Sequence, residues 1–429
     1  MMRTAALASI ACLMAGGAAT AADLGGDCCA DLEERIAELE ATAARKGNRK
    51  VSLSISGQIN KMLLAWDDGQ ESNAYVVGNK NDQSFFSFTG DAKIAEGWSA
   101  GYDITIRLRD DLSDDVSQDA DNGSGDGFQM WQAHWWIEGE KAGKLSVGLA
   151  SRVTDTAPEN DLSETAVAAY AGVQDIGGAF ELRTSSGAPV GLAWGDVYNH
   201  FNGDTANLVR YDTPELAGFV ASASWGEDDI WDIGLRYEGD GGGFKLAATI
   251  AYTEITDTDG VFADLDQSTL LGSAAILHEA TGLNFLVSAG VREFDQSVVD
   301  ADGALRTPDD AKFVYVKLGW LAQLNGLGPT GFYGEYGWFK DYVSAVDDSG
   351  GDASALVLDL GGVAGDRIGG STAEVWGFGV VQHIEAAEMQ LYAGYRLNEV
   401  DFEIVSGGAA ATNELEDFHT VVFGSKIAF

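Results

Sequence analysis

The residues of this chain whose types could do chemistry are carboxylates and arginines. The segment Val153–Ile176 carries spaced carboxylates, among them Asp155, Glu159, Asp161 and Glu164. Arginines recur on the polar positions of other stretches: Arg107, Arg109, Arg152, Arg183 and Arg210. Carboxylates that face guanidinium groups across a narrow gap create a transverse field, which orders water and sorts ions by charge and size. The alternative is that these charges only solvate a loop and a wide wall.

Side chains suited to catalysis or metal binding lack the spacing that either requires. The five histidines are scattered along the chain, and no two of them have metal-ligand spacing. No sharp strand-to-helix turn presents a serine nucleophile. The acidic segment Asp110–Asp126 could bind calcium, but its spacing departs from an EF-hand loop after Asp121 and no glutamate closes it, so a solvated loop is the alternative. We therefore expect no enzyme and no cofactor.

Composition narrows the possible partners. The chain of 429 residues has 67 acidic and 26 basic side chains, a formal charge of -41. Nucleic acid is an unsuitable partner, because phosphate binding needs clustered lysine and arginine. The mean hydropathy is -0.06, and past the N-terminus there is no apolar run of about 18 residues that would predict a membrane helix. A transmembrane β-barrel fits this average, because only every second strand residue faces lipid.

After Lys50 the hydrophobic pattern has a period of two, which predicts β-strands. Apolar residues alternate with polar ones in many short runs, including 51–55, 102–108, 145–149, 180–182, 192–194, 231–237, 285–291, 314–320 and 391–397. The opposite positions carry charged or hydroxyl side chains, among them Asp103, Arg107, Arg236 and Lys317. We therefore expect the inner wall to be polar and the interior to be filled with water rather than packed.

The connections between these runs alternate between short turns and long acidic loops. Val153–Ile176, Gln296–Asp310, Asp341–Thr372 and Glu399–Glu416 are expected to be long loops, whereas Asn199–Thr205 and Glu227–Asp229 are shorter than their positions require. Sorting of loops by parity is typical of an up-and-down transmembrane barrel. The runs number about 18, or about 16 if weak ones merge. The predicted fold class is therefore an all-β, antiparallel, up-and-down transmembrane β-barrel.

The N-terminus has the features of an exported protein. Met1–Ala22 contains a basic start, an apolar core and the small-residue site Ala19-Thr20-Ala21, which predict a signal peptide over 1–22. A linker and short helix follow over 23–50, where Leu32, Ile36, Leu39 and Ala43 form a heptad seam. This helix either joins copies of the chain or is a single solvated helix. The adjacent Cys28-Cys29 could cross-link subunits or form a vicinal bridge.

The C-terminal strand has its apolar residues on one face: Val421, Phe423, Ile427 and Phe429. A terminal strand that ends on phenylalanine resembles the closing strand of bacterial outer-membrane barrels, where that residue is the assembly signal. The resemblance assigns this role to Phe429. A soluble sheet that happens to end on phenylalanine is the alternative.

Two further stretches resemble alphaproteobacterial porins, a family of general outer-membrane porins. They are the N-terminal part, Asp31–Glu40 with Arg45–Leu53, and the run Arg210-Tyr211-Asp212-Thr213-Pro214, which is similar to the Arg-Tyr-Asp-Ser-Pro turn of general porins. The resemblance covers essentially the whole chain. It implies a 16-stranded barrel over 51–429, in outer-membrane lipid and often trimeric, with one loop folded into the lumen.

The resemblance also implies a function. Val153–Ile176 stands where porins fold a loop into the lumen, so Asp155, Glu159, Asp161 and Glu164 are expected at a constriction opposite the arginines. The expected function is passive diffusion of small hydrophilic solutes and ions through a homotrimer. The alternative is a substrate-specific channel for sugars or organic acids, which a count of 18 strands would favour.

Overall fold

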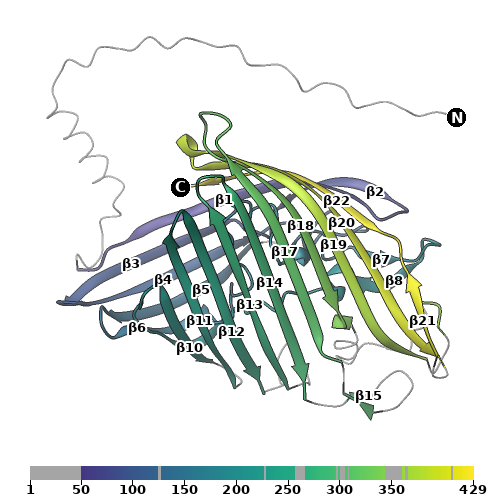
Figure 1. Ribbon diagram of the computed structural model, residues 1–429, viewed down its shortest axis with the longest axis horizontal. Helices are drawn as coiled ribbons and strands as arrows, with labels where there is room; N and C mark the ends of the chain where they lie inside the picture. Colours follow the sequence, from purple (N-terminus) through teal and green to yellow (C-terminus); the bar gives the residue numbers. More distant parts are fainter. Residues whose placement is uncertain are drawn as a thin grey trace, which may run out of the picture. The chain divides into compact units, whose positions relative to one another are not determined.

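The computed structural model describes residues 50–123, 127–226, 229–256, 266–295, 298–299, 305–307, 309–343, 360–362, 366–406 and 409–429. Within them the chain forms a closed antiparallel barrel of 16 strands, most of which pair with their neighbours in the sequence (Figure 1). The expected signal peptide, the cysteine pair and the helix with its heptad seam lie outside the described residues. In the described ranges, no helix is long and apolar enough to span a membrane.

The wall begins with β1 (Ser54–Asp67), β2 (Ser72–Gly78), β3 (Phe85–Ala95), β4 (Trp98–Arg109), β5 (Gly127–Gly139), β6 (Gly143–Ser151), β9 (Thr205–Asp212), β10 (Phe219–Gly226), β11 (Ile230–Gly241) and β12 (Phe244–Ile255). It continues with β13 (Gln267–His278), β14 (Leu283–Phe294), β17 (Ala311–Ala322), β18 (Thr330–Lys340), β19 (Arg367–Ile384), β20 (Met389–Ser406), β21 (Ala409–Glu414) and β22 (Phe418–Ala428). Separate hairpins are formed by β7 (Glu181–Arg183) with β8 (Pro189–Ala193) and by β15 (Val298–Val299) with β16 (Leu305–Arg306). The short helices are η1 (Val173–Asp175), α2 (Trp194–Val197) and η2 (Glu385–Ala387).

Two of the 16 wall strands are each split into two segments, β2 with β3 and β21 with β22. The segments β2 and β3 pair with different parts of β1, and β21 and β22 pair with different parts of β20. The strand count of about 18 is therefore wrong and the 16 implied by the resemblance is confirmed. The runs 180–182 and 192–194 caused the excess. They alternate like wall strands but lie in or beside the hairpin β7–β8, which is not part of the wall.

The closing pair of strands shows how the sequence pattern sets the two faces of the wall. β22 pairs with β1 over ten residues of each strand, from Gln58 opposite Ala428 to Asp67 opposite His419. Phe423 and Phe429 expose 61% and 60% of their surface on the outer side, whereas Val422 is buried on the inner side. The backbone of Phe429 exchanges two hydrogen bonds with Gly57, at 3.0 and 3.1 Å. The terminal pattern therefore does form the closing strand with its apolar face outward.

The connections are sorted by length, with one reassignment and one correction. Short turns such as 96–97, 140–142 and 242–243 join strands at one end of the barrel. The strand ends from which the long connections start, Arg109, Ser151 and Lys340, lie at the other end. The exception at Asn199–Thr205 disappears, because 199–204 belong to the single connection 152–204. The long loop expected at Glu399–Glu416 is wrong, because β20 and β21 extend the hairpin through most of it.

The inner wall has two different halves. From β3 to β12, here called the polar half, inward side chains are mostly polar, such as Thr105, Arg107, Ser146 and Arg210. From β13 through β22 to β1 and β2, here called the packed half, inward side chains form a buried apolar cluster: Leu64, Val77, Leu271, Leu286, Phe313, Tyr315, Phe339, Val375, Phe402 and Phe418. The expectation of a wholly polar, water-filled interior is therefore wrong for the packed half, because a long segment packs against it.

Candidate functional site

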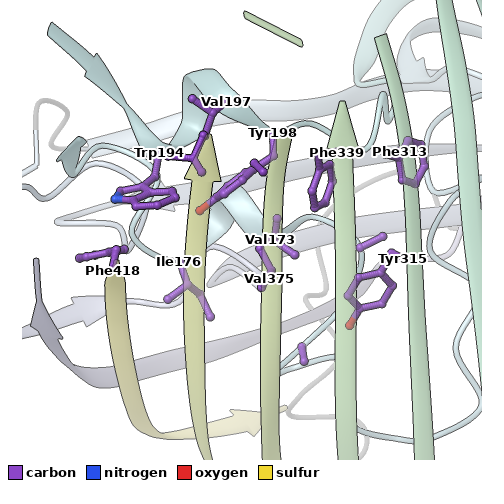
Figure 2. Close-up of a cluster of buried hydrophobic side chains, with 14 of the residues drawn as sticks. Val173, Ile176, Trp194, Val197, Tyr198, Phe313, Tyr315, Phe339, Val375 and Phe418 are labelled. Carbon is purple, nitrogen blue, oxygen red and sulfur yellow. The ribbon is translucent and has the colours of Figure 1, made fainter. Parts of the chain in front are cut away.

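That segment is the connection 152–204 between β6 and β9, here called the infolded segment. Its apolar side chains are buried together with those of the packed half, and Figure 2 shows Trp194, Tyr198 and Phe339 side by side. The ring of Phe180 lies 5.0 Å from the rings of both Trp66 in β1 and Phe418 in β22. The infolded segment thus extends well beyond the expected Val153–Ile176, and it is part of the hydrophobic core rather than a loop in water.

Charged side chains of the wall anchor the infolded segment at three places. Arg152 forms two hydrogen bonds with Asp232 in β11, at 2.7 and 3.1 Å. Lys317 in β17 donates to the carboxylate of Asp161 and to the carbonyl of Ala169, both at 2.7 Å. Arg396 in β20 pairs with Glu335 in β18 and donates to the carbonyl of Val173 at 3.0 Å. Because these charges are buried and each has an opposite partner, the segment is held in one place.

The polar half of the lumen stays open beside the infolded segment. A cavity of about 300 Å³ lies between the two, here called the constriction cavity. The wall contributes Lys80, Phe85, Arg107 and Trp131, and the infolded segment contributes Asp155, Glu159, Tyr170, Asp175, His200 and Asp204. A second cavity of about 640 Å³ lies along the same wall and is lined by Gln132, His134, Lys144, Arg210 and Arg236 among others. Both cavities therefore lie along the polar half of the barrel.

Two of the predicted carboxylates, Asp155 and Glu159, line the constriction cavity. Oε1 of Glu159 lies 2.9 Å from Nε2 of His200. Asp155 accepts a hydrogen bond of 3.2 Å from Asn202, but burial raises the pKa of Asp155 to about 6, and the nearby charges of Glu159 and Asp204 add to this. Burial also raises the pKa of Asp175 to about 6, against the opposing effect of Lys80. These two carboxyl groups therefore change their charge close to pH 6.

The other two predicted carboxylates lie elsewhere. Asp161 is buried against Lys317 on the far side of the infolded segment. Although burial opposes its ionisation, Lys317 holds the pKa of Asp161 below its usual value. A carboxylate oxygen of Glu164 is 3.6 Å from the ring of His383 in β19, away from the constriction cavity.

The five predicted arginines also differ in their positions. Arg107 alone lines the constriction cavity. Arg183, expected on the wall, lies instead in β7 of the infolded segment and pairs with Asp68 at 3.2 Å. Arg210 in β9 pairs with Asp212 at 2.9 Å and lines the second cavity, Arg152 binds Asp232 as described above, and Arg109 is half-buried at the end of β4.

The sequence pattern did not identify several residues of the constriction cavity: Lys80, Trp131, Asp175, His200 and Asp204. His200 and Asp204 fall in Asn199–Thr205, which was interpreted as a barrel loop. Trp131 lies where the alternation of β5 shifts by one residue, since Met130 faces outward and so does Trp135. That shift in phase is the signal that could have indicated an inward tryptophan.

The acidic segment Asp110–Asp126 shows no metal site in its described part, 110–123. Asp110 pairs with Lys61 at 2.5 Å and Asp114 with Lys80 at 2.9 Å. Asp111 accepts a hydrogen bond from the backbone of Gly123 at 2.9 Å. Across the ranges that the structure describes, no three histidine, cysteine or acidic side chains gather as metal ligands would.

Comparison with known proteins agrees with this architecture. A family model described as Gram-negative porin matches residues 5–404. The anion-selective porin from Comamonas acidovorans is similar in structure, with 18% identity and a TM-score of 0.53 over 88% of this chain and 100% of that chain. OmpT of Vibrio cholerae in its trimer form has 10% identity and a TM-score of 0.52 over 88% and 99%. OprB of Pseudomonas putida has 10% identity and a TM-score of 0.53 over 93% and 97%. No curated protein matches the sequence. At these identities the structural likeness describes the fold alone.

Proposed function

Because this chain belongs to the family of Gram-negative porins and is therefore an outer-membrane channel, we propose that its solutes pass only through the polar half of the lumen. The constriction cavity supports this proposal, since it is the charged space left between the wall and the infolded segment. Small hydrophilic solutes and ions would cross it by passive diffusion, without a cofactor. The packed half offers no such route, because its inward side chains are buried against the infolded segment.

We infer further that the channel prefers cations. Five carboxylates line the constriction cavity, Asp82, Asp155, Glu159, Asp175 and Asp204, against the two cations Lys80 and Arg107. Asp82 is paired with Lys426 and Lys80 with Asp114, so the remaining charges are still mostly negative. Fixed charges at close range set the ion preference of a pore. The preference would be opposite to the one in the name of the anion-selective porin of Comamonas acidovorans.

Planar bilayers test both proposals. With a tenfold gradient of KCl, the reversal potential should have the sign of potassium selectivity. Raising the salt should weaken the selectivity, because the Debye length falls from about 10 Å at 0.1 M to about 3 Å at 1 M. A reversal potential with the sign of chloride selectivity would contradict the cation preference. A protein that produces no stepwise increases in current would contradict a diffusion path through the polar half.

A catalytic role is not part of this proposal. The fold and the family are those of a channel, and we infer that the residues at the constriction cavity act on solutes only by charge and shape. Hydrolysis of ester or peptide substrates by the purified protein, abolished in a His200→Ala variant, would contradict this inference.

We also propose that the protein is a homotrimer. OmpT of Vibrio cholerae has a trimer form with a similar fold, and the heptad seam of Leu32, Ile36 and Leu39 would help to join copies. Changing these three residues to serine should dissociate the oligomer in mild detergent while the conductance of each pore persists. An oligomer that withstands the change would return this segment to a single solvated helix.

The alternative function, a substrate-specific channel, would show current block that saturates with one solute class. A general diffusion channel would show none. One arrangement of side chains in the constriction cavity favours a specific solute class, and it is argued next.

A further inference from the structure

Arg107 is the arginine that lines the constriction cavity, and it has no anionic partner in the part of the chain that the structure describes. Arg152, Arg183 and Arg210 each pair with an aspartate of the barrel wall or its turns. In contrast, within the described chain the guanidinium of Arg107 forms neither an ion pair nor a hydrogen bond. Its Cζ lies 3.6 Å from the centre of the Trp131 ring, and its Nε is buried without a partner. An arginine stacked in this way keeps the edge of its guanidinium available for a carboxylate.

Trp131 reaches the lumen because of a β-bulge in the pairing of β4 with β5. Thr105 is opposite Gln132 and Ile106 is opposite Met130, so Trp131 has no partner in the ladder. The extra residue turns the indole inward, where it lines the constriction cavity. Bulges commonly re-aim a side chain beside a functional site. The indole nitrogen is also buried without a hydrogen-bond partner in the described residues.

Phe85 completes an aromatic surface around the guanidinium. It is directly opposite Arg107 in the pairing of β3 with β4, and its ring meets that of Trp131 edge-on at 6.0 Å and 72°. This surface, formed by Phe85, Arg107 and Trp131, is here called the cationic platform. The two aromatic rings beside Arg107 form an apolar surface in a cavity that is otherwise lined mostly by polar side chains. An apolar group of a passing solute can pack against this surface.

The infolded segment presents the opposite charge across the same cavity. Asp155 and Asp204 line it together with the cationic platform. Lys80, the other wall cation there, is already paired with Asp114 at 2.9 Å. The cavity of about 300 Å³ is at the lower end of the size of small-molecule sites. It therefore has a cation without an ion-pair partner, two carboxylates that no cation pairs with in the described residues, and an apolar surface, all within the length of one small molecule.

We propose that the constriction cavity is a retention site for zwitterionic α-amino acids with an aromatic or large apolar side chain. The carboxylate of the solute meets Arg107, its ammonium group meets Asp155 and Asp204, and its side chain covers Trp131 and Phe85. This inference rests on the proposed diffusion path through the polar half. A simple carboxylate would be repelled by the aspartates, and a simple amine would leave Arg107 unpaired.

Current block in planar bilayers tests the site with four matched solutes. Phenylalanine should block the potassium chloride current with a half-blocking concentration at least about tenfold lower than those of phenethylamine, 3-phenylpropanoate and alanine, each of which lacks one of the three groups; a factor of ten corresponds to about 1.4 kcal/mol. Equal block by phenylalanine and phenethylamine would overturn the role of Arg107. Equal block by phenylalanine and alanine would overturn the role of the rings.

Variants separate the cationic platform from the rest of the lumen. Trp131→Leu and Arg107→Lys should each weaken phenylalanine block at least about fivefold, with the block expressed as a fraction of each variant's own current without phenylalanine. The matched control is Arg236→Lys in β11, which lines the second cavity and should leave the block unchanged. Equal effects of all three variants would overturn the assignment of the site to the cationic platform.

Titration calorimetry of the detergent-solubilised protein distinguishes failure of this inference from failure of the proposed function. Saturable binding of phenylalanine that is lost in Arg107→Lys supports the site, even if no ion current is recorded. Ion current without binding or block overturns the site and leaves the diffusion path intact.

Discussion

The two halves of this barrel interior have the same strand geometry but opposite environments. In the packed half, Lys317 is 1% exposed and each of its hydrogen bonds is made to the infolded segment. In the polar half, Arg236 pairs with Glu238 at 3.4 Å with both side chains more than half exposed. The comparison teaches that inward-facing charge does not by itself mean a water-filled lumen. Buried inward charges, such as Lys317 in the packed half and Asp232 in β11, hold the infolded segment, whereas Arg236 remains exposed to the lumen.

The largest expected difference between the halves comes from truncating an aromatic residue of the infolded segment. Phe180 is fully buried and contacts rings of β1 and β22. Phe180→Ala should lower the free energy of unfolding by about 3–5 kcal/mol, because it leaves a cavity in the core. Urea unfolding in detergent, followed by tryptophan fluorescence, measures this loss. Glu238→Gln in the polar half, whose side chain is 68% exposed, is the control and should change stability by less than about 1 kcal/mol. Similar losses in the two variants would remove the distinction between the halves.

Removing one member of a buried ion pair should have the next largest effect. Lys317→Met leaves the carboxylate of Asp161 buried and unpaired, and should cost about 3 kcal/mol. Because the pKa of Asp161 is lowered in the folded state, the stabilisation of the native protein is present at neutral pH and is lost as the pH falls through that lowered value. Adding Asp161→Asn to Lys317→Met should recover part of the loss in the same unfolding assay. A double variant as unstable as the sum of the single ones would contradict a direct pair.

The polar half should instead respond to pH in its ion selectivity. Asp155 and Asp175 have pKa values of about 6, so lowering the pH from 7.5 to 5 neutralises both. The permeability ratio of potassium to chloride should then fall about twofold, since fixed pore charge sets ion preference. Reversal potentials at the two pH values measure the change, and Asp155→Asn with Asp175→Asn should abolish it.

The same two groups predict a stability trend opposite to that of Asp161. A carboxyl group with a raised pKa binds its proton more tightly in the folded state. Its contribution to the free energy of unfolding therefore rises as the pH falls from about 6, the pKa in the folded state, towards the lower pKa of the unfolded state. For the selectivity prediction above, a permeability ratio that stays the same between pH 7.5 and 5 in the native protein would show that neither Asp155 nor Asp175 faces the ion path.

The smallest effect is expected from the exposed pair of the polar half. Arg236→Gln removes the ion pair with Glu238, whose side chains are 51% and 68% exposed. Such pairs contribute about 0–1 kcal/mol, so the urea midpoint should shift only slightly. A loss comparable to that of Lys317→Met would mean that this wall is packed in the membrane-bound protein.

The barrel wall was predicted well from the sequence, because the signals for its strands and turns lie between residues close together in the chain. Strand alternation, short turns and the outward Phe423 and Phe429 follow from a period of two against lipid. The interior was predicted less well, because the packed half and the infolded segment share the same alternation. Phe180 is buried by contacts with residues more than 100 positions away in the sequence, such as Trp66 and Phe418, and Leu182 belongs to the same buried cluster. Periodicity cannot report such contacts.

The candidate site was predicted in part for the same reason. Asp155, Glu159 and Arg107 do line one cavity, since a loop that enters the lumen must face some part of the wall. Asp161 and Glu164 follow within a few residues but turn to Lys317 and His383. Which carboxylate faces the open path depends on the backbone course of the infolded segment, and no spacing rule gives that course.

The position of Phe180 between Trp66 and Phe418 has a consequence for the order of biogenesis. These two rings belong to the first and last strands, β1 and β22, whose pairing closes the barrel. Because the two rings come together only when β1 pairs with β22, Phe180 can contact both of them only then. We therefore expect the infolded segment to complete its packing at the last step of assembly, when its contacts hold the two chain ends together.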